Sequence, residues 1–322
     1  MILVYWLVFI NVLAFIFYGI DKKKAKDKKW RISEATLITL AVIGGSAGAL
    51  AGMYVFHHKT RKKKFYITVP VFFVILVATC IYCLYQNYHL TKSYYDVDLG
   101  LEQDLTIVQI SDLHNQFFGI GQSVLLDRIR EEDPDMILVT GDLVDSTHTS
   151  YPIAMDFIEG ALEIAPVYYV TGNHEVRLAG EKMDAFISEM EEKGVQYIDD
   201  RYIDNGEYII AGISDSSLFY GTEMQTFDGS KPLIMLGHEP QYARLYSSLG
   251  ADLVFTGHYH GGQIIIPGVG GLFSPELEFF PEIYEGIHDY DGMKLVLSRG
   301  LGNSVFPVRI NNYPEIVVAH VS

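Results

Sequence analysis

Cysteine is scarce in this chain of 322 residues, which contains only Cys80 and Cys83. Both lie in an apolar run, so the rest of the chain has no thiol for a disulfide framework or a thiolate zinc site. Basic residues are also scarce after residue 90, because the first 90 residues hold 12 of the 24 Lys and Arg. The remainder has a net charge of −25. We therefore expect no disulfide partner and no nucleic-acid partner, which would need a basic footprint.

Long apolar runs are confined to the first 90 residues, whose net charge is +9. The runs are Ile2–Ile20, Ala35–Phe56 and Tyr66–Tyr85, each close to the ~20 residues that a membrane-spanning helix needs. Buried core helices of a soluble domain would not explain the basic blocks at the ends of these runs. A cleaved signal peptide would have a basic region before its apolar run, and no such region precedes Ile2. We predict a transmembrane region over residues 1–89 with two or three spans.

The side of the membrane depends on the middle run. Basic flanks are retained in the cytoplasm, and basic blocks follow the first run and precede the third. Both blocks can be cytoplasmic only if Ala35–Phe56 is re-entrant, which its glycines Gly44, Gly45, Gly48 and Gly52 would allow. We favour this arrangement, which places the remainder of the chain outside the cytoplasm. Three full spans would place it inside.

Four motifs in this region resemble a small bacterial integral-membrane domain of unknown function, over about residues 9–65. They are Tyr18-Gly-Ile-Asp-Lys22, Trp30-Arg-Ile-Ser-Glu34, Gly44-Gly45 and Phe56-His-His-Lys-Thr60. The resemblance implies a membrane location and no chemistry.

Residues 90–102 are polar and aromatic without periodicity, and we interpret them as a linker before a domain at 103–322. That domain alternates strand-like runs with amphipathic helices such as Glu181–Lys193. The predicted strands are Leu105–Ile110, Met136–Thr140, Val167–Thr171, Tyr208–Ile213, Leu233–Leu236, Leu253–Phe255, Ile264–Ile266, Met293–Leu297 and Glu315–Ala319. The pattern indicates an α/β domain with two packed mixed sheets flanked by helices.

Five of these strands are followed within a few residues by Asp, Asn or His. The candidate metal ligands are Asp112, His114, Asp142, Asn173, His238, His258 and His260. Ligand sites of open α/β sheets lie outside the carboxyl ends of strands, so the five ends can converge. Each motif alone is ordinary turn or capping chemistry. Together, seven oxygen and nitrogen donors without a thiolate suit two divalent ions such as Mn, Fe or Zn that share one carboxylate.

The order Asp-x-His, Gly-Asp, Gly-Asn-His, a single His and Gly-His-x-His resembles the calcineurin-like metallophosphoesterase superfamily, over about residues 104–320. Ser298-Arg-Gly-Leu-Gly302 and the segment 307–316 are similar to its membrane-associated bacterial phosphodiesterase branch. Tyr259 stands where that branch usually has Thr, and Glu175 where it usually has Asp. Neither difference removes a ligand.

The resemblance implies a role for each residue. Asp112, His114 and His260 would hold one metal ion, Asn173, His238 and His258 would hold the other, and Asp142 would bridge them. His174 would protonate the leaving oxygen. Arg299 could bind a phosphate oxygen or form a structural ion pair. Asp145 and Glu175 would orient their neighbours or simply be solvated turn residues.

We therefore expect a membrane-anchored dinuclear-metal hydrolase that cleaves a phosphodiester or pyrophosphate bond in a lipid-linked or envelope-associated substrate. One alternative is a phosphomonoesterase. Another is a membrane sensor or lipid-handling protein with an inert metal domain. The complete ligand set favours an enzyme.

Overall fold

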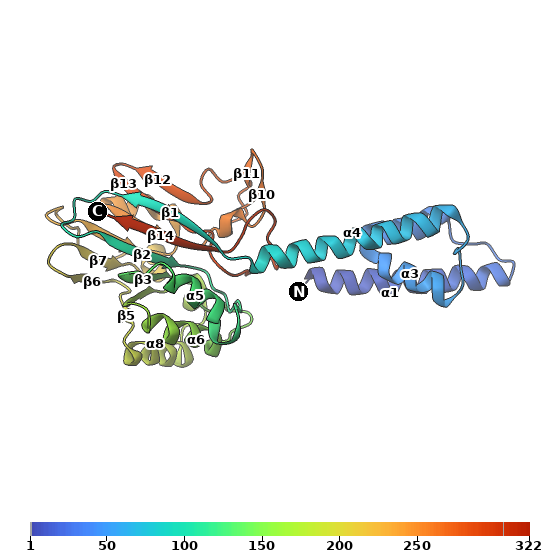
Figure 1. Ribbon diagram of the computed structural model, residues 1–322, viewed down its shortest axis with the longest axis horizontal. Helices are drawn as coiled ribbons and strands as arrows, with labels where there is room; N and C mark the ends of the chain where they lie inside the picture. The colour runs from blue at the N-terminus through green and yellow to red at the C-terminus, as the bar shows by residue number, and fades with distance from the viewer. Residues whose placement is uncertain (1, 305) are drawn as a thin grey trace. The chain divides into compact units, whose positions relative to one another are not determined.

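The computed structural model describes residues 2–304 and 306–322. The chain forms two compact units, one ending at Tyr85 and the other beginning at Gln86 (Figure 1). The first unit is helical, and the second is built on two β-sheets.

The first unit contains α1 (Ile2–Lys26), α2 (Glu34–Leu40), the π-helical turn η1 (Ala41–Gly45), α3 (Ser46–Val55) and most of α4 (Lys63–Tyr88). Three segments are long and apolar enough to cross a membrane, namely Val4–Lys26, Glu34–Val55 and Lys63–Tyr88. Apolar side chains on α1 and α4 are widely exposed, among them Val8 and Val74. Such surfaces are costly in water and suit lipid.

The middle segment reverses direction, although its length alone would permit a full span. A straight helix of 22 residues would separate its ends by about 33 Å. Instead the Glu34 carboxylate lies 2.8 Å from Lys59 Nζ, only four residues beyond the end of α3. The reversal occurs at Ile43 and Gly44, which have non-helical dihedral angles. The segment is therefore a helical hairpin, the geometry that the re-entrant interpretation requires.

Asn11 on α1 holds the turn of this hairpin. Its amide nitrogen donates to the Gly44 carbonyl at 2.9 Å, and its amide oxygen accepts from the Gly48 N–H at 2.8 Å. Gly48 needs to be glycine because a Cβ would lie 1.9 Å from the Asn11 carbonyl oxygen. These bonds satisfy the backbone groups that a turn inside an apolar layer would otherwise leave unpaired.

A buried carboxylate joins the two basic loops at the open end of the hairpin. Asp21 accepts from Arg31 Nη2 at 2.7 Å and lies 2.7 Å from His58 Nε2. Arg31 belongs to the loop after α1 and His58 to the loop after α3. The two basic loops therefore lie at the same end of the first unit.

The second unit contains two six-stranded mixed sheets. The first, in the order β1-β14-β2-β3-β4-β5, consists of β1 (Thr91–Val97), β14 (Glu315–Val321), β2 (Leu105–Ile110), β3 (Met136–Thr140), β4 (Val167–Val170) and β5 (Gln196–Tyr197). The second, in the order β12-β13-β9-β8-β7-β6, consists of β12 (Gly286–Tyr290), β13 (Met293–Leu297), β9 (Leu253–Thr256), β8 (Leu233–Leu236), β7 (Ile209–Gly212) and β6 (Arg201–Asp204).

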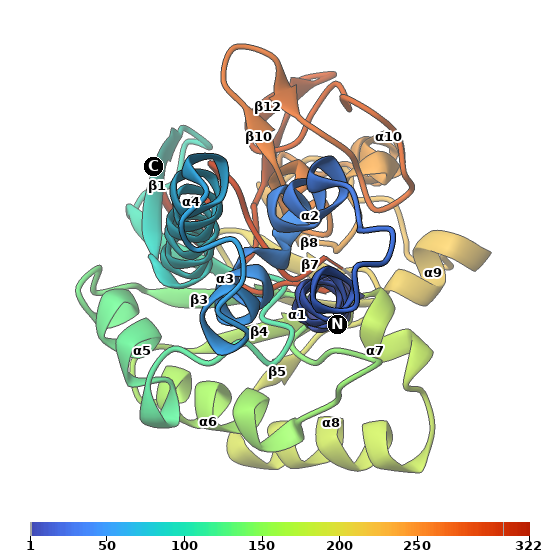
Figure 2. The same cartoon turned by 90° about the vertical axis from the view of Figure 1, so that its right-hand side faces the viewer.

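Apolar side chains from both sheets, such as Leu138 on β3 and Phe255 on β9, form one buried core between them. Helices α5 (Ser123–Arg130), α6 (Tyr151–Leu162) and α8 (Glu181–Lys193) cover the outer face of the first sheet, while α9 (Asp215–Tyr220) and α10 (Ala243–Ser248) cover the second (Figure 2). The predicted α/β architecture with two packed mixed sheets is confirmed.

The predicted linker over residues 90–102 is wrong for Thr91–Val97, which form β1. This strand pairs in parallel with β14 from Thr91↔Glu315 to Val97↔Val321. It lies at the edge of the sheet, and most of its side chains are only partly buried. The sequence therefore lacks the apolar run by which the central strands could be recognised.

Candidate metal centre

The seven predicted ligands lie on five loops, each of which starts at the carboxyl end of β2, β3, β4, β8 or β9. Donor atoms of Asp112, His114 and His260 lie within 4.8 Å of one another. Those of Asp142, His238 and His258 form a second group of the same kind. All six of these side chains are buried. A third group of the same kind joins His114 and Asp142 to His174.

Asp142 lies between the two groups. Its Oδ2 is 3.4 Å from His114 Nε2 in the first group and 3.3 Å from His238 Nε2 in the second. A single carboxylate oxygen therefore faces donors of both groups, the position that a bridging ligand would occupy.

The donor chemistry fits divalent cations. Nε2 of His114 lies 3.2 Å from Nε2 of His260, and Nε2 of His238 lies 3.1 Å from Nδ1 of His258. Each such nitrogen pair can share at most one proton, whereas a cation between them would accept both lone pairs. Burial lowers the pKa of His260 to about 3, which keeps this imidazole neutral and able to ligate.

Both carboxylates of the centre remain ionised despite burial. Burial opposes the ionisation of Asp112 and Asp142, but the surrounding imidazoles hold both pKa values below the usual range. Charged carboxylates are the ligand form that Mn, Fe and Zn require. Burial opposes the protonation of His114 and His238, but the same carboxylates raise the pKa values of both, and a bound cation would have to displace those protons.

Asn173 completes the second donor group. Its amide oxygen lies 3.2 Å from His238 Nε2. Turned over, the amide would instead place its oxygen 2.7 Å from Arg177 Nη2. The turned-over amide satisfies the hydrogen bonds of the metal-free site, whereas a bound cation would favour the first orientation because it needs an oxygen lone pair.

The backbone at the ligands is held in a costly conformation. Five of the seven ligand residues have positive φ, with values of 53° at Asp112, 44° at His114, 54° at Asp142, 69° at His258 and 48° at His260. Such angles are uncommon for residues with a Cβ and cluster at functional sites. The loops are therefore shaped to aim side chains, at a cost to local stability.

Two glycines let the ligand loops approach one another. A Cβ on Gly257 would lie 1.9 Å from Ser111 Oγ and 2.3 Å from Asp112 Oδ2. A Cβ on Gly172 would lie 2.4 Å from Asp142 Oδ1. Neither position has room for another residue.

Glu175, on α7 (Asn173–Arg177), holds the loop of Asp142. Its carboxylate accepts backbone N–H groups of Asp142 at 2.8 Å, Gly172 at 2.9 Å and Val144 at 3.2 Å. Burial, with the nearby Asp142 charge, raises its pKa to about 7. Of the two roles left open by the sequence, the geometry favours orientation.

His174 lies beside the donor groups, with its ring centroid 4.6 Å from that of His114. Its Nδ1 accepts the Ser146 N–H at 2.9 Å, so the neutral ring carries its proton on Nε2. Nε2 lies 3.2 Å from Ser304 Oγ, and Nδ1 lies 3.9 Å from Asp145 Oδ2. Burial lowers the pKa of His174 to about 4.

Arg309 and Asn312 support the His260 turn, η4 (His260–Gly262), and the sequence analysis gave them no role. Asn312 Nδ2 donates to the His260 carbonyl at 2.6 Å, and Asn312 Oδ1 accepts from Arg309 Nη1 at 3.3 Å. Arg309 is fully buried, and its Nη2 also donates to the Gly302 and Arg299 carbonyls. Both residues lie in the 307–316 motif, the only signal that pointed to them.

Glu276 orients His258 from the opposite side and was also missed. Its Oε1 lies 2.9 Å from His258 Nε2, which leaves Nδ1 facing the donor group. Burial opposes its ionisation, but the hydrogen bond to His258 holds its pKa at about 2. Glu276 lies in an irregular segment between β11 (Gly270–Gly271) and β12, whose path no periodicity reveals.

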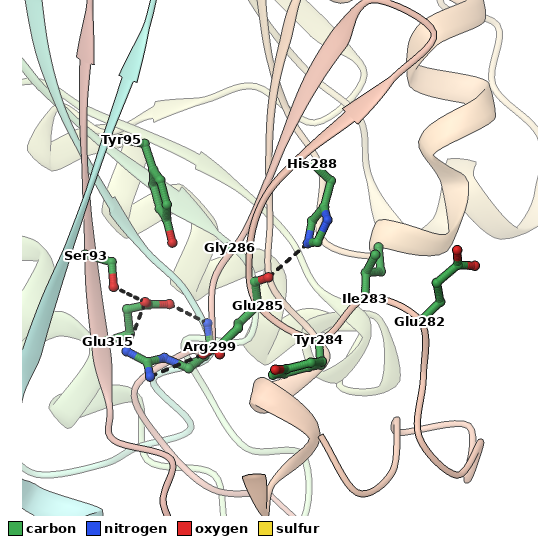
Figure 3. Close-up of a pocket in the computed structure, with 10 residues that line it drawn as sticks. All are labelled: Ser93, Tyr95, Glu282, Ile283, Tyr284, Glu285, Gly286, His288, Arg299 and Glu315. Atoms are coloured by element: carbon green, nitrogen blue, oxygen red, sulfur yellow. Dashed lines mark hydrogen bonds and ion pairs between the residues drawn. The ribbon is translucent and has the colours of Figure 1, made fainter. Parts of the chain in front are cut away.

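Arg299 lies in a separate pocket between β1 and β12 (Figure 3). Its guanidinium lies 3.0 Å from the Glu315 carboxylate and 3.3 Å from that of Glu285. Ser93 also hydrogen-bonds to Glu315. Of the two predicted alternatives, this geometry favours the structural ion pair.

Comparison with known families agrees with the geometry. Residues 105–262 match the family model of the calcineurin-like phosphoesterases. The chain carries a calcineurin-like metallophosphoesterase domain. Residues 11–65 match a second model, a protein family of unknown function (DUF1294).

Individual relatives follow the same division. The metallophosphoesterase domain is similar to the uncharacterized metallophosphoesterase YkoQ of Bacillus subtilis, at 25% identity over 68% of this chain and 84% of the relative. It is also similar to the phosphodiesterase YaeI of Escherichia coli, at 25% identity over 66% of this chain and 80% of the relative. The uncharacterized protein YsdA of Bacillus subtilis is 45% identical over 23% of this chain and 84% of its own length. A dimetal phosphatase from Danio rerio aligns with 61% of this chain and 88% of its own, at 12% identity and a TM-score of 0.41.

Proposed function

We propose that this protein is a membrane-anchored dinuclear-metal hydrolase that cleaves a phosphodiester or pyrophosphate bond. The observation that carries the proposal is the pair of buried donor groups that share the Asp142 carboxylate. The coarser activity, metal-dependent hydrolysis of a phosphoric ester, follows from the metallophosphoesterase domain.

Asp112, His114 and His260 would hold one ion, Asn173, His238 and His258 would hold the other, and Asp142 would contribute to both. Mn, Fe and Zn all suit this donor set. Two such ions, when bound, supply Lewis acidity to the phosphoryl oxygens and lower the pKa of a water nucleophile.

His174 acts on the leaving group. The Ser146 N–H fixes the neutral ring so that Nε2–H can donate a hydrogen bond to the leaving oxygen. Because burial keeps the ring neutral, transfer of a whole proton to that oxygen requires the ring to be doubly protonated first. Asp145, 3.9 Å from Nδ1, supplies negative charge on the other side of the ring. Glu175 keeps Asp142 in place through the three backbone N–H groups that it accepts.

Two observations favour diesters over monoesters. One relative is named a phosphodiesterase. In addition, the Glu276 carboxylate lies 2.9 Å from His258 Nε2 and places negative charge beside the second donor group. Such charge repels a dianionic monoester more than a monoanionic diester.

The test is to supply the full-length protein in detergent with Mn and to compare bis(p-nitrophenyl) phosphate with p-nitrophenyl phosphate. We expect faster turnover of the diester. Exclusive turnover of the monoester would establish the phosphomonoesterase alternative. Turnover of neither by metal-loaded protein would favour an inert sensor domain.

We also propose that the second unit, Gln86–Ser322, which we call the catalytic unit, is extracytoplasmic and acts on a lipid-linked or envelope-associated ester. The support is the helical hairpin, since Asp21 ties both basic loops to one end of the first unit. Basic loops are retained in the cytoplasm, and two spans then return the chain to the outer side. Protease added to intact, wall-stripped cells should digest the catalytic unit. Complete protection until lysis would place it in the cytoplasm.

A further inference from the structure

Exposed apolar side chains gather on three loops of the catalytic unit and at Tyr88, the last residue of α4. We call this set the apolar rim and define it as Tyr88, Phe117, Ile120, Leu277, Phe279 and Phe306, all of which are exposed. Ile120 is the extreme case at 88% exposure, and it stands between Gly119 and Gly121, which both have positive φ. A single exposed apolar residue needs no explanation, but a gathered set marks an interaction surface.

Two of the rim loops flank the residues at which α4 ends. Asn87 Nδ2 donates to the Pro307 carbonyl at 2.8 Å, beside Phe306, and Asn87 Oδ1 accepts from the Arg309 N–H at 2.8 Å. The Tyr88 ring meets the edge of Phe118 at 6.4 Å, beside Phe117. Because α4 is a candidate membrane span that ends at Tyr88, these loops lie where the chain would leave the bilayer.

The loop that carries Leu277 and Phe279 is joined to the loop that carries Phe306 by edge-to-face aromatic contacts. Phe306 contacts Phe273 with centroids 6.4 Å apart, and Phe273 contacts Phe279 at 6.5 Å. The rim is thus one surface built from segments far apart in the sequence.

The same loops carry parts of the metal centre. Phe117 follows His114 by three residues, and Leu277 follows Glu276, which bonds His258. Ser304 Oγ lies 3.2 Å from His174 Nε2, and the Phe306 carbonyl accepts from Gln263 Nε2 at 2.9 Å. A membrane that contacts the rim would therefore also lie close to the metal centre.

We propose that the apolar rim inserts into the interface of the bilayer that holds α4, so that the metal centre meets phosphate esters in the headgroup layer of that leaflet. Aromatic side chains favour this layer, because their rings are amphipathic or apolar. Electrostatic attraction is not the driving force, since every rim residue is apolar or aromatic and the acidic Glu276 and Glu278 flank Leu277. This inference rests on the proposed hydrolase function, and it adds the surface from which the substrate is taken.

The direct test measures insertion depth in the full-length protein. A background of Cys80→Ser and Cys83→Ser removes the native thiols, and a single environment-sensitive fluorophore is attached at Ile120→Cys. The matched control is Phe219→Cys on α9, since Phe219 is 73% exposed and lies outside the rim. Both proteins are placed in phosphatidylcholine nanodiscs that contain a doxyl-labelled lipid quencher.

We expect quenching at position 120 to exceed that at position 219 at least twofold. Equal quenching would overturn the proposal. Turnover of bis(p-nitrophenyl) phosphate by the unlabelled wild type is measured alongside. Its absence would refute the hydrolase function, whereas its presence with equal quenching would refute the rim alone.

A second measurement uses a diacylglycerol ester of p-nitrophenyl phosphate in the same nanodiscs, which has the leaving group of the soluble diester. Replacing Phe117 and Ile120 together by Ser should lower its turnover relative to the soluble diester by roughly tenfold, the effect of losing about one buried apolar side chain. The matched control replaces Phe219 and Tyr220 by Ser and should keep the wild-type ratio. An unchanged ratio in the rim variant would also overturn the proposal.

Discussion

Arg309→Met tests whether the buried Arg309 guanidinium holds the loops of the metal centre in place. Arg309 is fully buried, and its Nη2 lies 3.5 Å from Nδ1 of the predicted ligand His260. It donates to the Gly302 carbonyl at 2.6 Å, to the Arg299 carbonyl at 2.9 Å and to Asn312 Oδ1 at 3.3 Å. Met has a similar length but no donor.

The cost can be worked from those bonds. The change leaves two buried carbonyl groups without a donor, at about 1–3 kcal/mol each. Burial lowers the pKa of Arg309 to about 10, so the wild-type guanidinium is charged at neutral pH, and removing it spares that desolvation cost. We therefore expect a net loss of about 3 kcal/mol in unfolding free energy. Asn312 loses its partner and holds the His260 turn less firmly, which should weaken metal binding by roughly 10–100-fold.

Calorimetry of the full-length protein in detergent measures the stability, with the transition of the catalytic unit identified by its shift on adding Mn. Tryptophan fluorescence would not serve, because Trp6 and Trp30 both lie in the first unit. The control Arg201→Met removes an exposed arginine on β6 and should change little. Wild-type melting and wild-type Mn affinity in Arg309→Met would refute the reasoning.

Three further predictions concern other parts of the molecule. His174→Ala should retain two metal ions but lose roughly 10²–10⁴ in the hydrolysis of an alkyl ester, with a much smaller loss on a nitrophenyl ester, whose leaving group needs little protonation; equal losses in steady-state assays would exclude the proton-donor role. The pKa of His174 is about 4 in the folded protein and 6.5 in the unfolded chain, so the metal-free protein loses stability as the pH falls from 6.5 to 4. In denaturation experiments across that pH range, the unfolding free energy of His174→Gln should fall by up to about 3 kcal/mol less than that of the wild type. Gly48→Leu should disrupt the helical hairpin and lower the melting temperature of the first unit in detergent, because its Cβ would overlap the Asn11 carbonyl, while Ala51→Leu on the exposed face of α3 should be tolerated.

Much of the catalytic unit could be predicted because its central strands are short apolar runs. Leu233–Leu236 and Met293–Leu297 form strands with the predicted bounds, and both are almost wholly buried. Since parallel strands end at one edge of a sheet, the convergence of the polar residues that follow them could also be foreseen. Helix α6 was missed although Ala154, Phe157, Ile158 and Ala161 give it a buried face with helical spacing.

The supporting residues could not be predicted in the same way. Glu276, Arg309 and Asn312 act through irregular segments, whose course depends on contacts made after the sheets have formed. A carboxylate such as Glu276 looks like any exposed loop residue until the loop is placed beside His258. Edge strand β1 was not predicted for a related reason, because its partner strand β14 is more than 220 residues away in the sequence.

The path of the middle apolar run needed tertiary information as well. Its 22 residues satisfy the length of a full span, and its glycines permit either geometry. The contacts of Glu34 with Lys59 and of Asp21 with His58 show that the run folds as a hairpin. A soluble form of the enzyme should for similar reasons begin at Gln86, because a start after the predicted linker would remove both β1 and Asn87.

The most direct test of the dinuclear centre is to titrate the metal-free, full-length protein with Mn and follow it by electron paramagnetic resonance. We predict two ions per chain with the signature of spin coupling, because Asp142 contacts both donor groups and would hold the ions ~3.5–4 Å apart. His258→Ala should abolish the coupled signal. Binding of a single ion, or of two ions without coupling, would contradict the account.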